Sequence, residues 1–118
     1  MIEVFGIGID LVNITRFKEK PFQSNHNFYK KIFTNSEIKY CTKFNSYHQH
    51  FAGKFAIKEA VIKAISEKIS FRDISTSHSK KKPKITLDNE LDKKYGFMVS
   101  LSHESNFAIA VVISFKTI

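Results

Sequence analysis

The C-terminal third of the chain contains the strongest strand pattern, and it restricts the fold to one that includes a β-hairpin. Apolar residues alternate from Phe97 to Leu101 and alternate again from Phe107 to Phe115. This period places every second side chain on the same face of a sheet. Residues 103–106, between the two runs, read HESN and are typical of a turn. We therefore expect two antiparallel strands, with the turn beginning at His103.

The second of these strands is apolar on both faces. One face carries Phe107, Ile109, Val111, Ile113 and Phe115, and the other carries Ala108, Ala110 and Val112. A small domain can cover one such face with its own helices. The second face, that of Ala108, Ala110 and Val112, would remain as an apolar patch unless another chain buries it, so Val112→Asp is expected to dissociate the assembly. The pattern therefore favours an oligomer, with cover by the chain's own loops as the alternative.

A long helix is predicted over about residues 50–66, because apolar residues recur there at helical spacing and proline is absent. Within it, Glu59 and Lys63 are four positions apart and share one face. Residues 1–11 predict a strand that has Asp10 at its end. Two carboxylates and a lysine placed in this way can bind Mg²⁺ and phosphate. The residues alone leave other roles open: Asp10 as a helix cap, and Glu59 as a surface partner of Lys63.

The remaining segments predict short helices and strands. Gly6 and Gly8 would permit close backbone approach to the first strand, and Asn13 would cap a short helix. Thr34 and Glu37 form a capping box for a helix through about residue 44. We further expect an extended segment at 70–79, a basic loop at 79–84, a short strand at 85–87 and one helical turn from Leu91, and we assign no element to 22–32. Without repeats or linkers, residues 1–118 are predicted to form one α+β domain, a largely antiparallel sheet packed against a long helix and shorter helices.

The composition indicates a globular protein in a reducing compartment. Of the 118 residues, 42% are hydrophobic, and no apolar run approaches the roughly 20 residues that cross a bilayer. The N-terminus also lacks the basic and then apolar pattern of a signal peptide. The single cysteine, Cys41, excludes an internal disulfide and is expected to be a small buried residue rather than a nucleophile. These features predict a cytoplasmic protein that does not bind a membrane.

The charge of the chain predicts an anionic partner. Lys and Arg number 19 against 11 Asp and Glu, which gives a formal net charge of +8. Such a surface suits nucleic acid, a phosphate-rich ligand or an acidic protein. A small basic nucleic-acid-binding protein is therefore the alternative function, supported by the aromatic content and by the SKKKPK segment at 79–84. Against it, the basic residues are scattered and form no recognised binding motif.

Four sequence blocks resemble those of the holo-acyl-carrier-protein synthases, the short, bacterial-type 4′-phosphopantetheinyl transferases. They are GIGID at 6–10, T-x-x-E at 34–37, FAxKEAxxKA at 55–64 and SLSHESNFAIAVVI at 100–113. The resemblance covers nearly the whole chain. It implies Mg²⁺-dependent transfer of 4′-phosphopantetheine from coenzyme A to a serine of apo-acyl carrier protein, a step of fatty acid biosynthesis that releases adenosine 3′,5′-bisphosphate. The nucleophile then belongs to the carrier, so this chain needs none of its own.

The resemblance also implies roles for single residues. Asp10 and Glu59 would bind the metal and take part in catalysis, and Lys63 would contact the phosphates of the coenzyme. His103 would lie beside the coenzyme, either as a phosphate contact or as a proton carrier. The general base would be Glu59 or a metal-bound water, and the sequence leaves this choice open.

Two further lysines are candidates for binding the coenzyme. Lys54 stands where the family usually has Arg, so the charge is kept and the bidentate fork is lost. Lys58 is about 100° around the helix from Glu59, so it would serve another ligand, a neighbouring subunit or only solvent. Glu104 stands where the family often has Ser, which adds a negative charge beside His103.

The resemblance extends to partners and assembly. Arg16 and Lys20, on the short helix after the first strand, are expected to bind the acidic carrier protein. The family assembles as a homotrimer with coenzyme A between subunits, and we expect the same here. For His48 and His50, a loop–helix boundary is a simpler interpretation than a metal site. The lysines of the SKKKPK segment either form a solvated loop or clamp the nucleotide phosphate.

Overall fold

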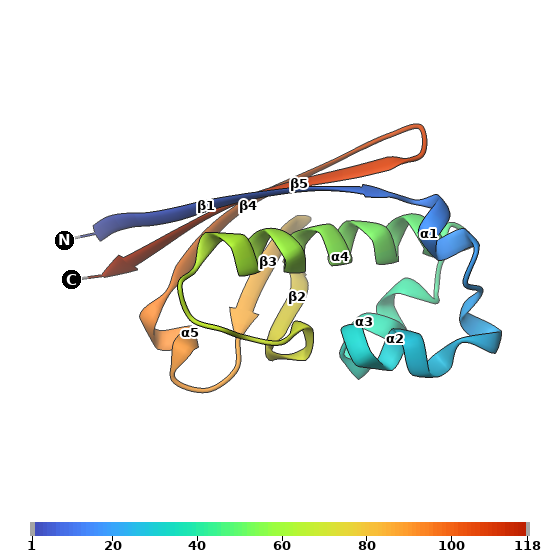
Figure 1. Cartoon of the computed structure of the whole chain (residues 1–118), viewed down its shortest axis with the longest axis horizontal. Coiled ribbons are helices and arrows are strands. Elements are labelled where there is room, and N and C mark those ends of the chain that lie inside the picture. Colours follow the sequence, from blue (N-terminus) through green and yellow to red (C-terminus); the bar gives the residue numbers. More distant parts are fainter. Residues whose placement is uncertain (1, 118) are drawn as a thin grey trace.

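A three-stranded antiparallel sheet lies on one side of a long central helix (Figure 1). The strands are β1 (Ile2–Asn13), β4 (Gly96–Glu104) and β5 (Phe107–Thr117), in the order β1-β5-β4. The helix is α4 (Tyr47–Ala64), which crosses beneath the sheet and contacts all three strands. The predicted α+β class and C-terminal hairpin are thus confirmed. The computed structural model describes the backbone of residues 2–117 and the side chains of residues 6–116.

Shorter elements pack around α4 on the side away from the sheet (Figure 1). Four of them follow β1: α1 (Thr15–Lys18), the 3₁₀ turn η1 (Phe22–Ser24), α2 (His26–Ile32) and α3 (Asn35–Cys41). After α4 come the 3₁₀ turn η2 (Phe71–Asp73), the hairpin of β2 (Ile74–Ser79) and β3 (Lys82–Leu87), and α5 (Leu91–Lys94). No helix among the described residues is long and apolar enough to cross a membrane.

Glycine and alanine bring β1 very close to α4. A Cβ on Gly8 would lie 1.9 Å from the carbonyl oxygen of Ala60, and one on Gly6 would lie 2.3 Å from that of Ala64. Neither contact is sterically possible, so only glycine fits at these two positions. The expected close backbone approach is therefore confirmed, and its physical cause is a helix whose sheet-facing residues are small.

The inward face of the sheet is the one with the small residues. Ala108, Ala110 and Val112 are fully buried against α4, whereas the larger residues of β5 point outward. On β1 the outward residues Ile7 and Ile9 are 66% and 55% exposed. The expectation that another chain covers the face of Val112 is therefore wrong, because the chain's own helix buries that face and leaves the other one outward. The close approach of α4 decides which face is inside, because only small side chains fit beneath the helix.

Two predicted local structures are wrong in detail. The basic segment at 79–84 is not a loop, because Lys82 already begins β3 and only Lys80 and Lys81 form the turn, both with positive φ. His103 does not begin a turn: it pairs with Ala108 inside the β4–β5 ladder. The strands continue because the turn itself needs only two residues, 105 and 106.

Other predictions at the ends of elements hold more closely. Asn13 is not the N-cap residue of α1, which is Ile14, but its Oδ1 atom accepts a hydrogen bond from the backbone of Thr15 at 3.0 Å, at the start of that helix. The capping box of Thr34 and Glu37 is present, although α3 ends at Cys41, three residues earlier than expected. Cys41 is fully buried, as expected, and burial raises the pKa of its thiol to about 12.

Candidate active site

Asp10, Glu59 and Lys63 come together at the β1 edge of the sheet. The Lys63 Nζ atom lies 3.3 Å from Oδ1 of Asp10 and donates a hydrogen bond of 2.9 Å to the carbonyl oxygen of Ile9. Glu59 stands one turn before Lys63 on α4, half-buried. Asp10 does not cap the following helix: it lies inside β1, and the N-cap residue of α1 is Ile14. The structure therefore unites the three residues that the sequence placed together.

The two carboxylates form an environment that suits a divalent cation. Burial raises the pKa of Glu59, the negative charge of Asp10 raises it further, and Lys63 and Arg16 act in the opposite direction. A cation between the carboxylates would relieve this repulsion. Among the described residues there is no cluster of three or more His, Cys, Asp or Glu that could hold a metal. Two carboxylates fit Mg²⁺, which takes its other ligands from water and substrate phosphates.

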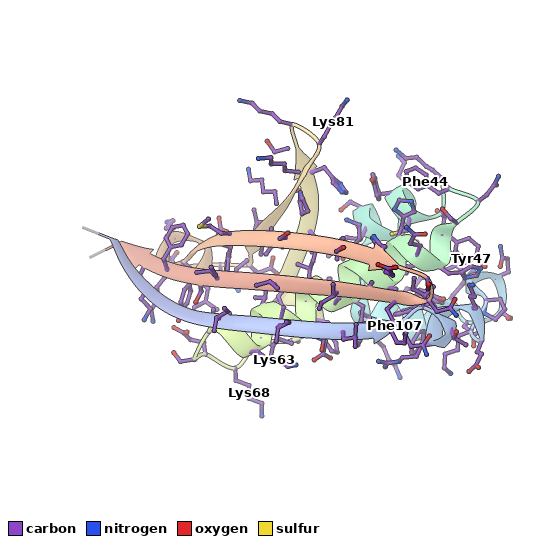
Figure 2. The ribbon with its side chains drawn as sticks, turned by 90° about the horizontal axis from the view of Figure 1, so that it is seen from above. Phe44, Tyr47, Lys63, Lys68, Lys81 and Phe107 are labelled. Atoms are coloured by element: carbon purple, nitrogen blue, oxygen red, sulfur yellow. The ribbon has the colours of Figure 1, made fainter. Side chains whose placement is uncertain are left out.

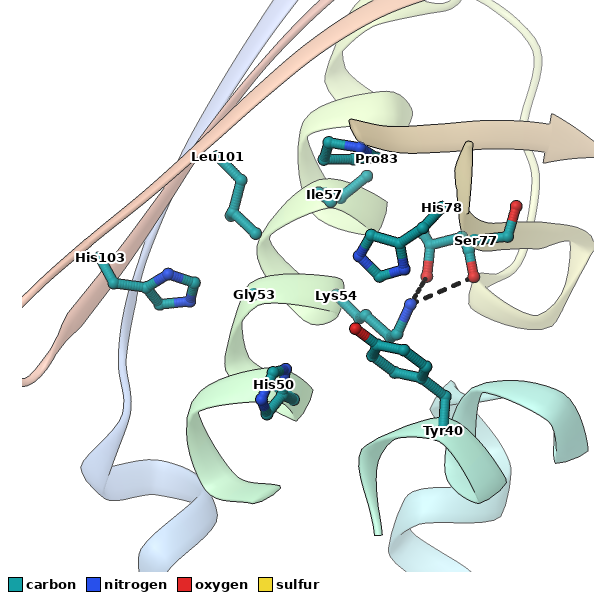
Figure 3. Close-up of a pocket in the computed structure, with 11 residues that line it drawn as sticks. Tyr40, His50, Gly53, Lys54, Ile57, Ser77, His78, Pro83, Leu101 and His103 are labelled. Carbon is teal, nitrogen blue, oxygen red and sulfur yellow. Dashed lines mark hydrogen bonds between the residues drawn. The ribbon is translucent and has the colours of Figure 1, made fainter. Parts of the chain in front are cut away.

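A second group of polar residues lines a small pocket between α4, β2 and β4 (Figure 3). Lys54 is the buried cation of this pocket, with 5% of its surface exposed. It donates to the Thr76 carbonyl oxygen at 3.2 Å and to the Thr76 hydroxyl at 3.0 Å, and its Nζ lies 4.8 Å above the Tyr40 ring. His103 enters from β4, and a Cβ on Gly53 would lie 3.2 Å from its Nε2 atom. Gly53 thus makes room for the imidazole against the helix.

The two groups lie on opposite sides of α4. Lys54 and Lys63 are nine residues apart, which at about 100° per residue places them on opposite faces of the helix. Asp10 is on β1 and His103 is on β4, which form the two edges of the three-stranded sheet. In Figure 2, Lys63 lies on the β1 side of the sheet and Lys81, at the tip of the β2–β3 hairpin, on the β4 side. The chain therefore carries two separate groups of polar residues, divided by its own helix α4.

Lys58 matches none of the expectations made for it, because its buried side chain reaches neither solvent, nor a ligand, nor a neighbouring subunit. Its side chain is fully buried and forms a 2.7 Å ion pair with Glu37. Its ammonium also donates to the carbonyl oxygens of Ile32, Phe71 and Ile74 at 2.8–3.0 Å. All its hydrogen-bonding capacity is thus used inside the chain, where it ties α4 to four other elements, α2, α3, η2 and β2.

Glu37 has more roles than the sequence showed. Beyond the capping box, its Oε2 atom accepts hydrogen bonds from the backbone and the hydroxyl of Thr76, both at 2.7 Å. Burial alone would raise the pKa of Glu37. The charge and hydrogen bond of Lys58, together with the hydrogen bonds from Thr34 and Thr76, outweigh burial and lower this pKa. A buried chain of contacts therefore runs from Lys58 through Glu37 and Thr76 to Lys54. The T-x-x-E pattern is fully explained by capping and gives no sign of it.

Arg16 and Lys20 form a basic surface around an aromatic side chain. Both are exposed, and with Glu19 and the half-buried Phe28 they line a shallow cavity. The Lys20 Nζ lies 5.0 Å from the centre of the Phe28 ring, and the Arg16 guanidinium lies 4.9 Å from that of Phe55. Because Arg16 also influences the pKa of Glu59, this surface adjoins the carboxylate pair.

Two pocket residues had no predicted role. His50 is in the first turn of α4, which begins at Tyr47, and points into the same pocket as Lys54, four residues later. This spacing was a usable signal, because residues four apart share a helix face. His78 reaches the pocket from β2, and nothing in the local sequence could indicate this.

Comparison with known proteins identifies the family. The model of the 4′-phosphopantetheinyl transferase superfamily matches residues 6–112. The holo-[acyl-carrier-protein] synthase of Geobacter metallireducens is 36% identical over 93% of this chain and 96% of its own length. That of Chlamydia felis is 34% identical over 96% and 98% of the two chains. The chain therefore belongs to the 4′-phosphopantetheinyl transferase superfamily, within its group of short holo-[acyl-carrier-protein] synthases.

Solved structures agree with this placement. The holo-[acyl-carrier-protein] synthase of Helicobacter pylori, in complex with coenzyme A, is 37% identical and superimposes with a TM-score of 0.78 over 92% of this chain and 98% of its own. The synthase of Bacillus anthracis, in complex with CoA (3′,5′-ADP), is 27% identical with a TM-score of 0.81, over 98% and 99% of the two chains. The fold described above is thus that of the family.

Proposed function

We propose that this chain transfers the 4′-phosphopantetheine group of coenzyme A to a serine of apo-acyl carrier protein, as its relatives' names describe. The observation that carries the proposal is the grouping of Asp10, Glu59 and Lys63 at the β1 edge in a chain of this family. The serine oxygen attacks the phosphorus that bears the pantetheine. The new O–P bond replaces one bond of the pyrophosphate, and adenosine 3′,5′-bisphosphate leaves.

Asp10 and Glu59 would hold Mg²⁺, whose chemistry here is to neutralise charge on the phosphate oxygens. Lys63 would bind the same phosphates, and its exposed ammonium is free to turn toward them because 52% of its side chain is accessible. The serine proton passes to a base that is either Glu59 or a water molecule held at the site. Burial suits Glu59 to the task because it raises the pKa of the carboxyl toward neutral pH.

We propose that the active form is a homotrimer with sites between subunits. The two groups on either side of α4 would each form a half-site, and they cannot meet around one coenzyme within a subunit, since the helix lies between them. The outward face of the sheet supplies an apolar surface for association. Ile7, Ile9, Leu11 and Met98 are each more than half exposed there, and such a patch is typical of a surface buried in an assembly. The Asp10 half-site of one subunit would then face Lys54 and His103 of the next.

The carrier protein would bind at the basic surface of Arg16 and Lys20. Acyl carrier proteins are acidic, and the surface combines two cations with the Phe28 ring beside the carboxylate pair. The chain would act as a single domain in the cytoplasm, where its one cysteine, Cys41, needs no disulfide partner.

The test is transfer itself, followed as the mass increase of apo-carrier incubated with coenzyme A and Mg²⁺. Asp10→Ala and Glu59→Ala should each lower the rate by at least about 100-fold while the fold is kept, since neither carboxylate is in the core. Glu90→Ala is the matched control, because this carboxylate is 88% exposed and, among the described residues, forms an ion pair with Lys93 alone. Full activity of either site variant at limiting Mg²⁺ would remove that residue from the metal site.

A nucleic-acid-binding protein would behave differently in one simple assay. Coenzyme A with Mg²⁺ should raise the melting temperature of the protein, since a ligand that binds only the folded state stabilises it. Single-stranded DNA should not. Stabilisation by DNA alone, with no transfer to the carrier, would reverse the assignment.

A further inference from the structure

The pocket between α4, β2 and β4 contains three histidines that the chemistry at Asp10 and Glu59 does not use. Figure 3 shows His50, His78 and His103 entering it from α4, β2 and β4, with Lys54 among them. None of the described residues that line the pocket is acidic. An enclosure with one ammonium, three imidazoles and no carboxylate is suited to an anion.

Aromatic contacts fix two of these histidines in place. Tyr40 stacks on His78, with ring centres 4.8 Å apart, and meets the His50 ring edge-on at 5.8 Å. Phe44 also stacks on His50, with ring centres 3.9 Å apart. Rings held in this way lose little further freedom when a ligand arrives.

Both imidazoles lie among positive groups. Burial lowers the pKa of His50, and the charges of His103 on β4, Lys54 on α4 and His78 on β2 lower it further. The pKa of His78 is lowered by partial desolvation of its ring, which stays exposed on the surface, and then by the charge of Lys54. Tyr40 on α3 is the other titratable group among the described residues that line the pocket. In the free protein at pH 7 both rings are therefore neutral, and an arriving anion would favour their protonation.

Coenzyme A has one phosphate group that the Asp10 half-site does not bind. This argument rests on the proposed function, which places the pyrophosphate at Asp10, Glu59 and Lys63. The remaining group is a phosphate monoester on the ribose, and it carries nearly two negative charges at pH 7 because its second pKa is about 6. In the proposed assembly it would enter this pocket of the neighbouring subunit.

We propose that His50 and His78 complete the site for this phosphate monoester, and that they take up protons as it binds. They supply hydrogen-bond donors that Lys54 alone lacks, since a lysine has no bidentate fork where the family usually has Arg. Lys54 has in any case committed two donor contacts to Thr76. The affinity for the coenzyme should therefore rise as the pH falls toward 6.

The size of the effect follows from linkage. Each proton taken up on binding changes the dissociation constant by up to about tenfold per pH unit. Between pH 7.5 and 6.5 the affinity for adenosine 3′,5′-bisphosphate should rise by about threefold to thirtyfold, as one or both rings respond. Below about pH 6 the monoester itself binds a proton, and the gain should stop.

Calorimetry of adenosine 3′,5′-bisphosphate binding, in buffers that differ in ionisation enthalpy, measures the proton uptake directly. The protein should take up protons with this nucleotide and with coenzyme A, and should take up none with dephospho-coenzyme A, which lacks the monoester. The variant His50→Gln/His78→Gln should bind at pH 7.5 but lose both the uptake and the pH dependence. His48→Gln is the matched control, because His48 is on the same turn of α4 and does not line the pocket.

The outcomes separate this inference from the proposed function. Transfer to the carrier with pH-independent nucleotide binding, or proton uptake that persists in the double variant, overturns the histidine site and leaves the function standing. Failure to bind coenzyme A and to transfer overturns both. If the double variant does not fold, His78→Gln alone serves, because His78 is exposed and its loss should still reduce the uptake.

Discussion

The carboxylate of Glu37 and the ammonium of Lys58 form a 2.7 Å ion pair in which the two side chains are only 1% and 0% exposed. Glu37 belongs to the start of α3 and Lys58 to the middle of α4. The pair therefore fixes the distance between two helices, and through Thr76 it also fixes β2 and Lys54.

Removing one partner of this pair should destabilise the fold. Glu37→Gln should lower the free energy of unfolding at pH 7 by about 3–5 kcal/mol, because the charge of Lys58 remains buried without compensation. The pKa of Glu37 is lower in the folded chain than in the unfolded chain, so its contribution is complete above about pH 4.5 and is lost as the pH falls through the folded value. Urea unfolding of wild type and variant should therefore converge at acid pH. A constant difference between pH 7 and pH 3 would contradict this.

The contact between β1 and α4 allows no side chain at residue 8. Gly8→Ala should prevent stable folding or shift the helix, because its Cβ would lie 1.9 Å from the Ala60 carbonyl oxygen. Thermal unfolding should show a loss of several kcal/mol, as expected for overpacking against backbone. Ser100→Ala, at an exposed position of β4, is the control and should melt close to wild type.

Neighbouring residues of β5 should respond in opposite ways to the same change. Val111→Asp places a charge on the outward face and should give a folded monomer, whereas Val112→Asp buries a charge against α4 and should not fold. Sedimentation equilibrium should give three times 13.6 kDa for the wild type and 13.6 kDa for Val111→Asp. An active monomer at micromolar concentration would refute both the trimer and the shared sites.

Shared sites can be shown by mixing two inactive variants. Asp10→Ala damages one half-site and His103→Ala the other, on opposite edges of the sheet. Unfolding and refolding them together should restore activity, because some interfaces will pair two intact half-sites. With equal amounts and random assembly, half of the interfaces have an intact Asp10 half-site, and half of those also have an intact His103 half-site. About one quarter of the interfaces are therefore intact. Activity that stays at the level of the separate variants would place both residues in one subunit's site.

Recognition of the carrier should depend on charge at Arg16. Arg16→Glu should raise the KM for the carrier by about tenfold or more and leave coenzyme A binding nearly unchanged, with a weaker salt dependence than wild type. Lys93→Glu is the control, because this lysine is 80% exposed on α5 and distant in sequence from the basic surface. Equal carrier KM values for the two variants would defeat the assignment.

The sequence predicted what depends on local patterns, and missed what depends on contacts between distant segments. The alternation of β5, the spacing of Glu59 and Lys63, and the capping box at Thr34 are visible in short windows, and the structure contains all three. The burial of Lys58 could not be foreseen, because its partners come from four other parts of the chain. His78 reaches the pocket only because the β2–β3 hairpin packs beside α4 and β4. Which face of β5 is inside also depended on the approach of α4.

Helix α4 separates two half-sites. In the proposed trimer, the two half-sites of one subunit would bind two different coenzyme molecules. The same rigid rod therefore sets the position of groups in two neighbouring clefts. Because its backbone rests directly on Gly6 and Gly8, it has little room to tilt. A substitution that moves α4 at one intersubunit cleft would therefore also displace residues in the neighbouring cleft. The three clefts of the trimer would keep a fixed geometry relative to one another, without a hinge between them.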